Sequence, residues 1–319
     1  MRYTSTNKIM KQTTNNIMMI EPVLFNYNSE TAVNNYYQIN DLALSNEKVQ
    51  QKAHDEFSEF VSLLRSKGVN VFVFKDTTEP HTPDSIFPNN WISLHQSGEV
   101  FLFPMFAQNR RAERRSDIIS RLQKNFKISQ INSLTHYENQ NIYLEGTGSM
   151  IFDRVNKICY AARSLRTNEI VLEDFCSQIK YELVVFSAFQ DANNKRLEIY
   201  HTNVMMCVAN NYAVVCLDSI DSNTERLNVV NSLSKTKKEI IEISEYQANQ
   251  FAGNMLQVTG DQDYLVMSKT AYDSLNKSQI EQITSFNDII YANLDIIEKC
   301  GGGSARCMMA EIFLPLKDD

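Results

Sequence analysis

Hydrophobic positions along this chain follow two alternating patterns, which together predict an α/β protein. Short apolar runs bounded by turn residues, such as NVFVF at 70–74, are typical of buried strands. Between such runs lie segments with helical spacing. In the first of these, Val49, Ala53, Phe57 and Phe60 recur every three or four residues, as on one face of a helix.

The same order of elements recurs along the chain, as two strands, a helix and a further strand. A plain open α/β sheet also alternates strands and helices, but this regular repetition favours equal units arranged around a central axis. The last apolar segment, at 303–316, is expected to be one more strand. The expected helices span about 49–64, 110–126, 169–179, 224–233 and 270–283.

The predicted units form one domain. No stretch rich in proline, glycine or serine divides the chain, so residues 17–319 are expected to form a single α/β propeller domain. Residues 1–16 are polar and rich in asparagine and threonine, which favours a flexible tail.

Composition excludes several classes of protein. The chain has 319 residues, of which 43% are hydrophobic and 22% charged, with a net charge of −7, as in ordinary globular proteins. The acidic balance gives no basic surface for nucleic acid. No apolar run is long enough to span a membrane, and the first residues lack the apolar core of a signal peptide, so we expect a cytoplasmic protein.

Cysteine, histidine and arginine spacings exclude further kinds of site. The six cysteines form no CxxC pair and the five histidines are dispersed, so neither a zinc site nor a disulfide framework is predicted. A local basic cluster has Glu113 within it and apolar residues after it, which indicates the solvated face of a helix. The cluster comprises Arg110, Arg111, Arg114 and Arg115.

The strongest chemical signal is the segment CGGGSARCMMAEI at 300–312. Three consecutive glycines are costly in conformational entropy unless the backbone turns sharply or approaches a ligand. Cys307 follows them at the expected start of a strand, beside Arg306, in the electropositive setting where thiols ionise readily. A glycine turn followed by an inert buried cysteine is the alternative interpretation.

Three further polar patches also stand where a loop enters a predicted strand. His201 opens one strand with Asn203 on the same face, and Glu145 precedes the glycines of LEGTG. Asp84 and Asn90 lie in the segment PDSIFPNNW, before the only tryptophan. Each patch alone could be structural: a histidine at a strand edge, a surface glutamate, or a polar turn.

Taken together, the patches favour an active site. Each falls in a different unit, and equivalent loops of a radial fold converge on its axis. A cysteine, a histidine and a glutamate brought together there would supply a nucleophile, an acid/base group and a group that orients the histidine.

The ordered motifs FPNN, LEGTG, HTN and GGGSARC resemble those of the amidinotransferase and arginine deiminase superfamily. That superfamily has a five-bladed α/β propeller fold, called pentein. The resemblance implies that Cys307 is the nucleophile, His201 the acid/base and Glu145 the orienting residue. It also implies that no metal or organic cofactor is needed.

Two more stretches resemble dimethylarginine dimethylaminohydrolases. SLRTN at 164–168 resembles a segment whose arginine binds the substrate's α-carboxylate, which implies that role for Arg166, with Arg163 as a further helper. PDSIF at 83–87 resembles that subfamily too, so Asp84 is a candidate contact for a small amino-acid substrate.

The sequence departs from the arginine-processing members at two positions. Those members usually carry aspartate where this chain has Asn90, and again where it has Asn203. A guanidinium buried without its carboxylates would be an uncompensated charge, whereas a neutral ureido group can use both the donor and the acceptor of an asparagine. The departures favour a citrulline-like substrate, hydrolysed at a C–N bond through a covalent cysteine intermediate.

Two alternatives remain open. The first is an arginine deiminase, a dimethylarginine dimethylaminohydrolase or an amidinotransferase. The second is a pentein domain that binds a partner without catalysis, although the intact cysteine, histidine and glutamate favour an enzyme. The sequence also leaves a homodimer open.

Overall fold

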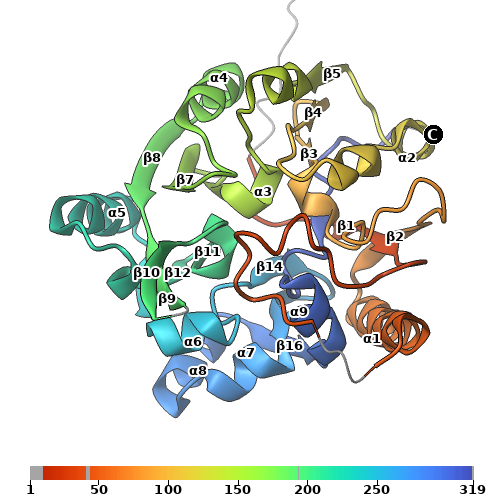
Figure 1. Cartoon of the computed structure of the whole chain (residues 1–319). Helices are drawn as coiled ribbons and strands as arrows, with labels where there is room; N and C mark the ends of the chain where they lie inside the picture. Colours follow the sequence, from red (N-terminus) through yellow and green to blue (C-terminus); the bar gives the residue numbers. More distant parts are fainter. Residues whose placement is uncertain (1–9, 41–43, 193, 318–319) are drawn as a thin grey trace, which may run out of the picture.

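A computed structural model describes residues 10–40, 44–192 and 194–317. Five three-stranded sheets stand around a central axis, and the longer helices lie on the outside of the ring (Figure 1). The five-bladed α/β propeller predicted from the sequence is therefore confirmed.

Each blade combines two antiparallel strands with a third strand that pairs in parallel. In the second blade, β3 (Ile92–Leu94) and β4 (Glu99–Leu102) are antiparallel, and β5 (Gln130–Ser133) returns parallel to β4. A parallel return needs a crossover connection, which a helix supplies. The corresponding blades are β6 (Ile151–Asp153), β7 (Ile158–Arg163) and β8 (Glu182–Ser187); β11 (Met206–Val208), β12 (Tyr212–Val215) and β13 (Glu239–Glu242); and β14 (Leu256–Thr259), β15 (Asp263–Ser268) and β16 (Asp288–Ala292).

The first blade joins the two ends of the chain and closes the ring. Strand β1 (Asn16–Glu21) pairs in parallel with β2 (Asn70–Lys75) and antiparallel with β17 (Ala310–Glu311). The predicted strand at 303–316 is thus much shorter than expected. The residues before β17 form a turn in which the Cys307 N–H donates to the Ser304 carbonyl.

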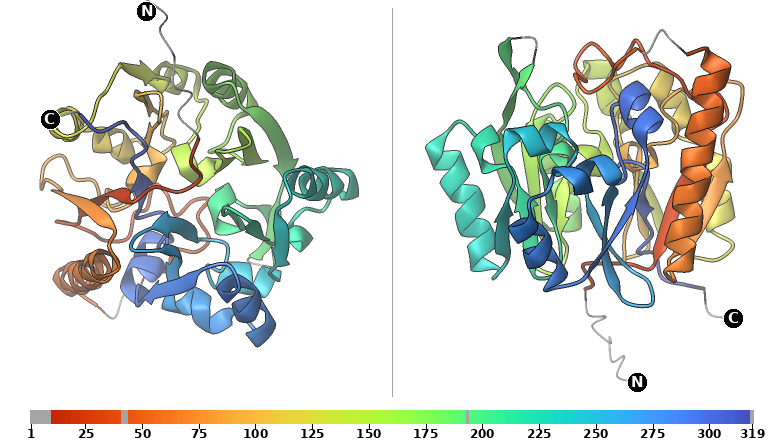
Figure 2. Two further views of the ribbon diagram at one scale, coloured as in Figure 1. Left: turned by 180° about the vertical axis from the view of Figure 1, so that it is seen from behind. Right: turned by 90° about the horizontal axis from the view of Figure 1, so that it is seen from below.

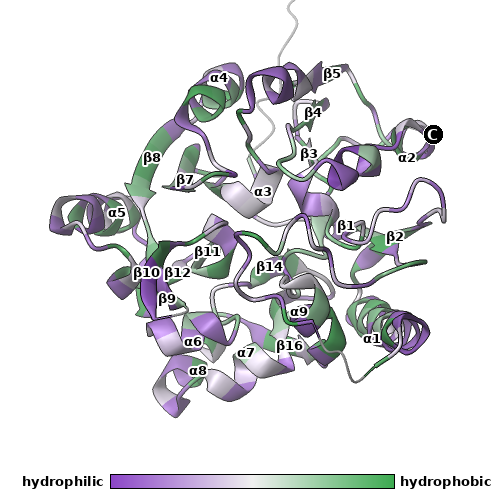
Figure 3. Cartoon of the chain, viewed as in Figure 1, coloured by the Kyte–Doolittle hydropathy of each residue, from purple (hydrophilic) through white to green (hydrophobic). Residues whose placement is uncertain are grey.

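The outer helices bury one face against their sheets. Ser45 caps the start of helix α1 (Asn46–Ser66), because its side chain accepts from the Lys48 N–H, and the polar residues of the helix face outward (Figure 3). Two predicted helices are divided, namely 110–126 into η2 and α2, and 270–283 into α7 and α8. The other helices are η2 (Asn109–Glu113), α2 (Ser116–Leu122), η3 (Thr135–Gln140), α4 (Glu169–Ile179), η5 (Leu217–Ser219), α5 (Asn223–Lys235), α6 (Glu245–Asn249), α7 (Lys269–Ser274), α8 (Lys277–Thr284) and α9 (Asp295–Gly301).

One short turn leads into the inner strand of every blade, and these turns gather near the axis. Three of them are single helical turns: η1 (Pro88–Asn90), α3 (Gly146–Ser149) and η4 (Thr202–Val204). The remaining two, at 251–253 and 305–308, precede β14 and β17. The repeated geometry of the blades therefore places residues of five distant segments side by side.

The chain also contains parts that the strand–strand–helix–strand pattern does not predict. A hairpin of β9 (Phe189–Ala192) and β10 (Lys195–Glu198) projects from one face of the ring, and the described N-terminal residues 10–15 lie on the opposite face (Figure 2). Within that segment, buried Gln12 donates to the carbonyls of Phe152 and Val208 at 2.8 and 3.0 Å. Gln12 of the predicted tail is thus bonded to two blades, whereas residues 1–9 lie outside the described residues.

No helix within the described ranges is both long and apolar enough to cross a membrane.

Candidate active site

The predicted site residues meet at one cavity near the axis. Asp84, Asn90, Arg166, His201 and Cys307 all line it. Its volume is about 10 Å³, which is room for about one water molecule. The cavity is therefore almost closed in this structure.

Glu145 lies directly behind His201 and is completely buried. Its Oε2 is 2.8 Å from His201 Nε2, and its Oε1 accepts from the Phe106 N–H at 3.0 Å. Burial alone would raise the pKa of the Glu145 carboxyl, but Arg166, His201 and Arg110 outweigh burial and hold it well below its usual range. Glu145 is therefore a carboxylate that can orient the imidazole.

His201 is the neutral partner of this pair. Burial lowers the pKa of His201 to about 4, although the neighbouring Glu145 opposes that shift. Because an ionised Glu145 can only accept, Nε2 carries the imidazole proton and Nδ1 keeps a lone pair. A Cβ added to Gly148 would stand 2.8 Å from Nδ1, so the free nitrogen faces the LEGTG turn across a gap that only glycine leaves open.

Cys307 is 3% exposed, and its Sγ lies between two asparagine amides. The Nδ2 groups of Asn203 and Asn254 each donate to Sγ at 3.2 Å. Arg306, expected to give the thiol an electropositive setting, instead points away and pairs with Glu311 at 2.7 Å. Neutral N–H donors, rather than a cation, therefore surround the sulfur.

The glycine loop before Cys307 approaches other segments closely. A Cβ on Gly303 would lie 2.9 Å from the Phe87 ring and 3.2 Å from Cys307 Cβ. Gly302 has a φ of +63°, in the left-handed region that favours glycine. Sharp turning and close contact therefore both account for the glycines that the sequence singled out.

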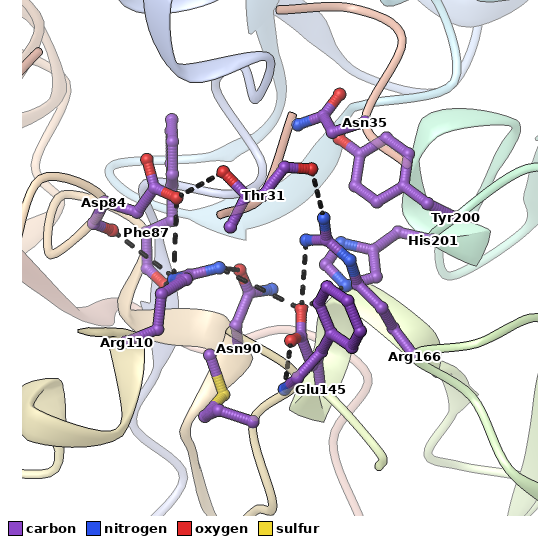
Figure 4. Close-up of polar contacts among 12 residues, drawn as sticks. Thr31, Asn35, Asp84, Phe87, Asn90, Arg110, Glu145, Arg166, Tyr200 and His201 are labelled. Carbon is purple, nitrogen blue, oxygen red and sulfur yellow. Dashed lines mark hydrogen bonds and ion pairs between the residues drawn. The ribbon is translucent and has the colours of Figure 1, made fainter. Parts of the chain in front are cut away.

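Arg110 belongs to the site, which corrects its assignment to a solvated helix face. It is 2% exposed and pairs with Glu113 through Nε and Nη2 at 2.8 and 2.9 Å. Its Nη1 donates to Asn90 Oδ1 at 2.8 Å (Figure 4). The spacing of Arg110 and Glu113, three residues apart, was the available signal for such a buried pair.

Arg166 reaches the cavity, whereas Arg163 does not. Arg166 is 1% exposed, and its guanidinium donates to the Thr31 carbonyl at 2.8 Å and lies 3.4 Å from Glu145 Oε2 (Figure 4). The guanidinium of Arg163 instead pairs with Glu169 and Glu225 on the outer helices α4 and α5. The prediction that Arg163 helps at the site is therefore wrong in this structure.

Residues 28–39, between β1 and α1, cover the cavity; we call them the covering segment. Thr31 donates to Asp84 Oδ2 at 3.0 Å, and the Asn35 amide donates to the Gly301 and Gly302 carbonyls. Sequence reasoning missed this segment, as well as Asn254 and the cavity-lining Tyr200. The available signal was a long loop of tyrosine and asparagine without regular spacing, of the kind that often carries function.

Three buried polar atoms at the site have no hydrogen-bond partner within the described chain. They are Asp84 Oδ1, Asn90 Nδ2 and Asn203 Oδ1. Burial raises the pKa of the Asp84 carboxyl, and Arg110 opposes that shift. Buried polar groups normally find partners, and Asp84 and Asn90 line the cavity, so one acceptor and one donor there are available to a ligand.

The fold and the site together define a pentein-type hydrolase that acts on C–N bonds of guanidino compounds. Residues 21–314 match the family model described as N,N dimethylarginine dimethylhydrolase, eukaryotic. The chain belongs to that family.

Solved structures with the same fold share little sequence with the chain. The N-terminal domain of the cyanobacterial arginine dihydrolase ArgZ, covalently bound to a reaction intermediate, has a TM-score of 0.73 at 17% identity, over 94% of this chain and 98% of that one. Unliganded AgrE has a TM-score of 0.71 at 19% identity, over 95% of this chain but 40% of its own. A dimethylarginine dimethylaminohydrolase adduct with S-methyl-L-thiocitrulline has a TM-score of 0.60 at 15% identity, over 93% and 99%. A comparison with curated sequences found no match.

Proposed function

We propose that this protein hydrolyses the guanidino group of arginine or an N-methylated arginine, with Cys307 as the nucleophile. The observation that carries this proposal is the meeting of a thiol and an oriented imidazole in one buried cavity of a guanidino-hydrolase fold. Asp84, which lines the cavity, adds an unpartnered acceptor oxygen, and Asn203, which contacts Cys307 Sγ, has a second; such oxygens suit the N–H groups of a guanidinium. Asp84, His201 and Cys307 derive from separate segments of the ring, so their convergence is a property of the whole fold.

In the first half-reaction, the Cys307 thiolate attacks the guanidinium carbon and a C–S bond forms. His201 takes up the proton that leaves the thiol. It can do so because burial keeps the imidazole neutral before the reaction. The C–N bond to the departing amine then breaks, and His201 passes its proton to that amine. The cysteine is left as an S-alkylthiouronium.

In the second half-reaction, water attacks the thiouronium carbon. His201 accepts one proton from this water and the other leaves to solvent, while the C–S bond breaks and restores the thiolate. The product carries a ureido group whose oxygen derives from water. Glu145 remains ionised throughout and stabilises the imidazolium that forms transiently.

We assign the α-carboxylate of the substrate to Arg166. Its guanidinium is buried at the cavity and presently donates to Asn34 Oδ1 at 2.9 Å and to the Thr31 carbonyl. Both partners belong to the covering segment, so movement of that segment would free these donors for a carboxylate, which binds an arginine more strongly than neutral acceptors do. Such movement is also needed for entry, since a cavity for about one water cannot admit an amino acid.

A citrulline-like substrate is the second candidate, and the orientation of Asn90 favours it. The guanidinium of Arg110 can only donate hydrogen bonds. The Asn90 amide therefore turns its oxygen toward Arg110, which leaves its NH₂ for the cavity. A substrate guanidinium offers that NH₂ no acceptor, whereas a ureido oxygen does. The same contact would hold the ureido product of the first candidate, so only kinetics separates the two.

A substrate panel tests the proposal. Arginine, monomethylarginine, dimethylarginine and citrulline are each incubated at equal concentration, and ammonia, methylamines and citrulline are quantified. We expect amine release from at least one guanidino compound, with a ureido product appearing at the same rate. Turnover of citrulline alone would replace this proposal with the second candidate, and turnover of none of the four compounds would contradict both.

A further inference from the structure

Asn254 contacts the sulfur of Cys307, although no sequence motif pointed to it. It lies in the turn before β14, is fully buried, and donates from Nδ2 to Cys307 Sγ at 3.2 Å. The same Nδ2 donates to the Asn203 carbonyl at 3.1 Å. The blade of β14, β15 and β16 thus contributes to the site through a turn equivalent to those that carry His201 and Cys307.

The direction of the Asn254 amide is fixed by its surroundings. The backbone N–H of Arg306 donates to Asn254 Oδ1 at 3.0 Å. Because a backbone N–H can only donate, the oxygen must face Arg306, and the NH₂ must face Sγ. The amide therefore cannot turn over without losing the Arg306 bond and placing an acceptor against the sulfur.

Close packing between neighbouring turns brings this amide to the sulfur. A Cβ on Gly253 would lie 2.4 Å from the Val204 carbonyl oxygen and 2.6 Å from Met205 Cα. Glycine therefore lets the fourth turn rest directly on the third. This contact sets Asn254 beside Asn203, so that both amides reach the same atom.

Both hydrogen bonds that the described part of the chain makes to Sγ come from neutral amides. A hydrogen bond to an ionised acceptor is roughly twice as strong as one to a neutral acceptor. Two N–H donors aimed at the sulfur therefore bind a negatively charged sulfur more strongly than a neutral one, without the cation that the sequence suggested.

We propose that Asn254 is a catalytic residue which, together with Asn203, holds Cys307 as the thiolate that attacks the substrate. This inference rests on the proposed function, in which Cys307 is the nucleophile. The amides exchange no proton during the reaction; the thiol proton passes to His201, and the amide N–H groups stabilise the charge left on sulfur.

The test measures the rate of Cys307 alkylation by iodoacetamide as a function of pH in the full chain. Asn254→Ala removes the donor and should move the midpoint of the profile upward by about one pH unit, with roughly tenfold slower alkylation at neutral pH. The kcat should fall by a similar factor with little change in KM. Iodoacetamide can reach Cys307 only after the covering segment opens. This step is common to all variants, so it does not contribute to the difference between their alkylation profiles.

Asn287→Ala is the matched control, because Asn287 is also a buried asparagine of the same blade. Its Oδ1 accepts from Tyr212 and Gln257 at 2.9 and 2.8 Å, away from the sulfur. This variant should lose stability but keep the alkylation profile. If Asn254→Ala does not fold, Asn254→Asp is measured instead, because it keeps the acceptor for Arg306 while removing the donor, and the same upward movement is expected.

An unmoved profile in the Asn254 variant, or an equal movement in the Asn287 variant, would overturn the inference. The proposed function fails differently, since either the substrate panel would show no guanidino turnover or Cys307→Ala would retain it. A turnover-dead Cys307→Ala combined with an unmoved Asn254 profile would remove only the role of Asn254.

Discussion

At the scale of single residues, Asn90 shows how the surroundings of a side chain set its chemistry. An asparagine can offer a cavity either its NH₂ or its oxygen, and here Arg110 occupies the oxygen at 2.8 Å. The donor that remains stands beside Gly148 and His201, since a Cβ on Gly148 would lie only 2.4 Å from Asn90 Nδ2. Orientation of the reacting groups thus depends on the absence of one methyl group.

Gly148→Ala should therefore damage catalysis more than folding. The added Cβ would also lie 2.8 Å from His201 Nδ1, so the imidazole or the amide must shift. A displacement of about 1 Å in an active site costs about a hundredfold in kcat/KM. Steady-state kinetics and thermal unfolding measure the two effects separately. Gly98→Ala is the control, because Gly98 has a φ of +87° outside the site, and its replacement should cost roughly 1–2 kcal/mol of stability without loss of kcat/KM. Equal kinetic losses in both variants would contradict the assignment.

The neutral state of His201 predicts a dependence of stability on pH. Burial lowers its folded-state pKa to about 4, against 6.5 unperturbed, so the unfolded chain binds the proton more readily. The contribution of His201 to stability is then complete above pH 6.5 and is lost as pH falls toward 4. The loss is on the order of 3 kcal/mol at most.

Urea unfolding of the unmodified protein and His201→Gln, at several pH values between 7 and 4.5, measures this contribution as a difference. The comparison matters because other buried groups titrate in the same range; burial raises the pKa of Glu56 to about 7, for example, with the opposite effect on stability. The advantage of the unmodified protein over His201→Gln should shrink as pH falls. A constant advantage would show that folding leaves the pKa of His201 unchanged, and a growing advantage would show that folding raises it; either result would contradict a buried neutral imidazole.

At the scale of elements, the segment after β4 has a structure that amphipathic periodicity does not describe. The predicted helix at 110–126 is divided, because Arg110 and Glu113 turn inward from η2 and form a buried ion pair before α2 begins. The sequence showed a run of arginines and indicated solvent exposure. Which arginine is buried depends on contacts with Asn90 and Asp84, which no local pattern contains.

Loss of one partner of this pair should be far worse than loss of both. Arg110→Met leaves Glu113 buried without compensation, which costs about 3–5 kcal/mol of unfolding free energy. Adding Glu113→Leu should recover most of that loss, so a double-mutant cycle by urea unfolding should show strong coupling. As a control, Lys277→Ala breaks an exposed pair with Glu281 and should cost less than about 0.5 kcal/mol. Additive losses at Arg110 and Glu113 would contradict the buried pair.

The elements that sequence reasoning predicted are those whose signal is local. Helix α4 lies at Glu169–Ile179, as predicted, because its apolar spacing and the cap at Asn168 are both contained within the segment. Asn254 and the covering segment were missed because their roles come from contacts across the ring. Nothing near Asn254 in the sequence distinguishes it from other turn asparagines.

At the scale of the whole molecule, the ring explains why four motifs far apart in the sequence contribute to one site. Equivalent turns before the inner strands converge on the axis, so residues as distant as Asn90 and Cys307 line one cavity. Pairing of β1 with β17 closes the ring and fixes the turn that holds the cysteine. The motifs alone do not predict the substrate, because the group that Asn90 turns toward the cavity depends on its contact with Arg110. The extent of the domain over residues 17–319, the cytoplasmic location and a homodimer stay predictions.

The central claim is that Cys307 carries a covalent intermediate during hydrolysis. Acid quenching during turnover of the preferred substrate, followed by mass spectrometry of the Cys307 peptide, tests it most directly. The account predicts a substrate-derived adduct on Cys307 that forms before product, on no other of the six cysteines, and that is absent, together with turnover, in Cys307→Ala. Near-native turnover by Cys307→Ala, or steady-state turnover in which Cys307 stays unmodified while another group carries the adduct, would contradict it.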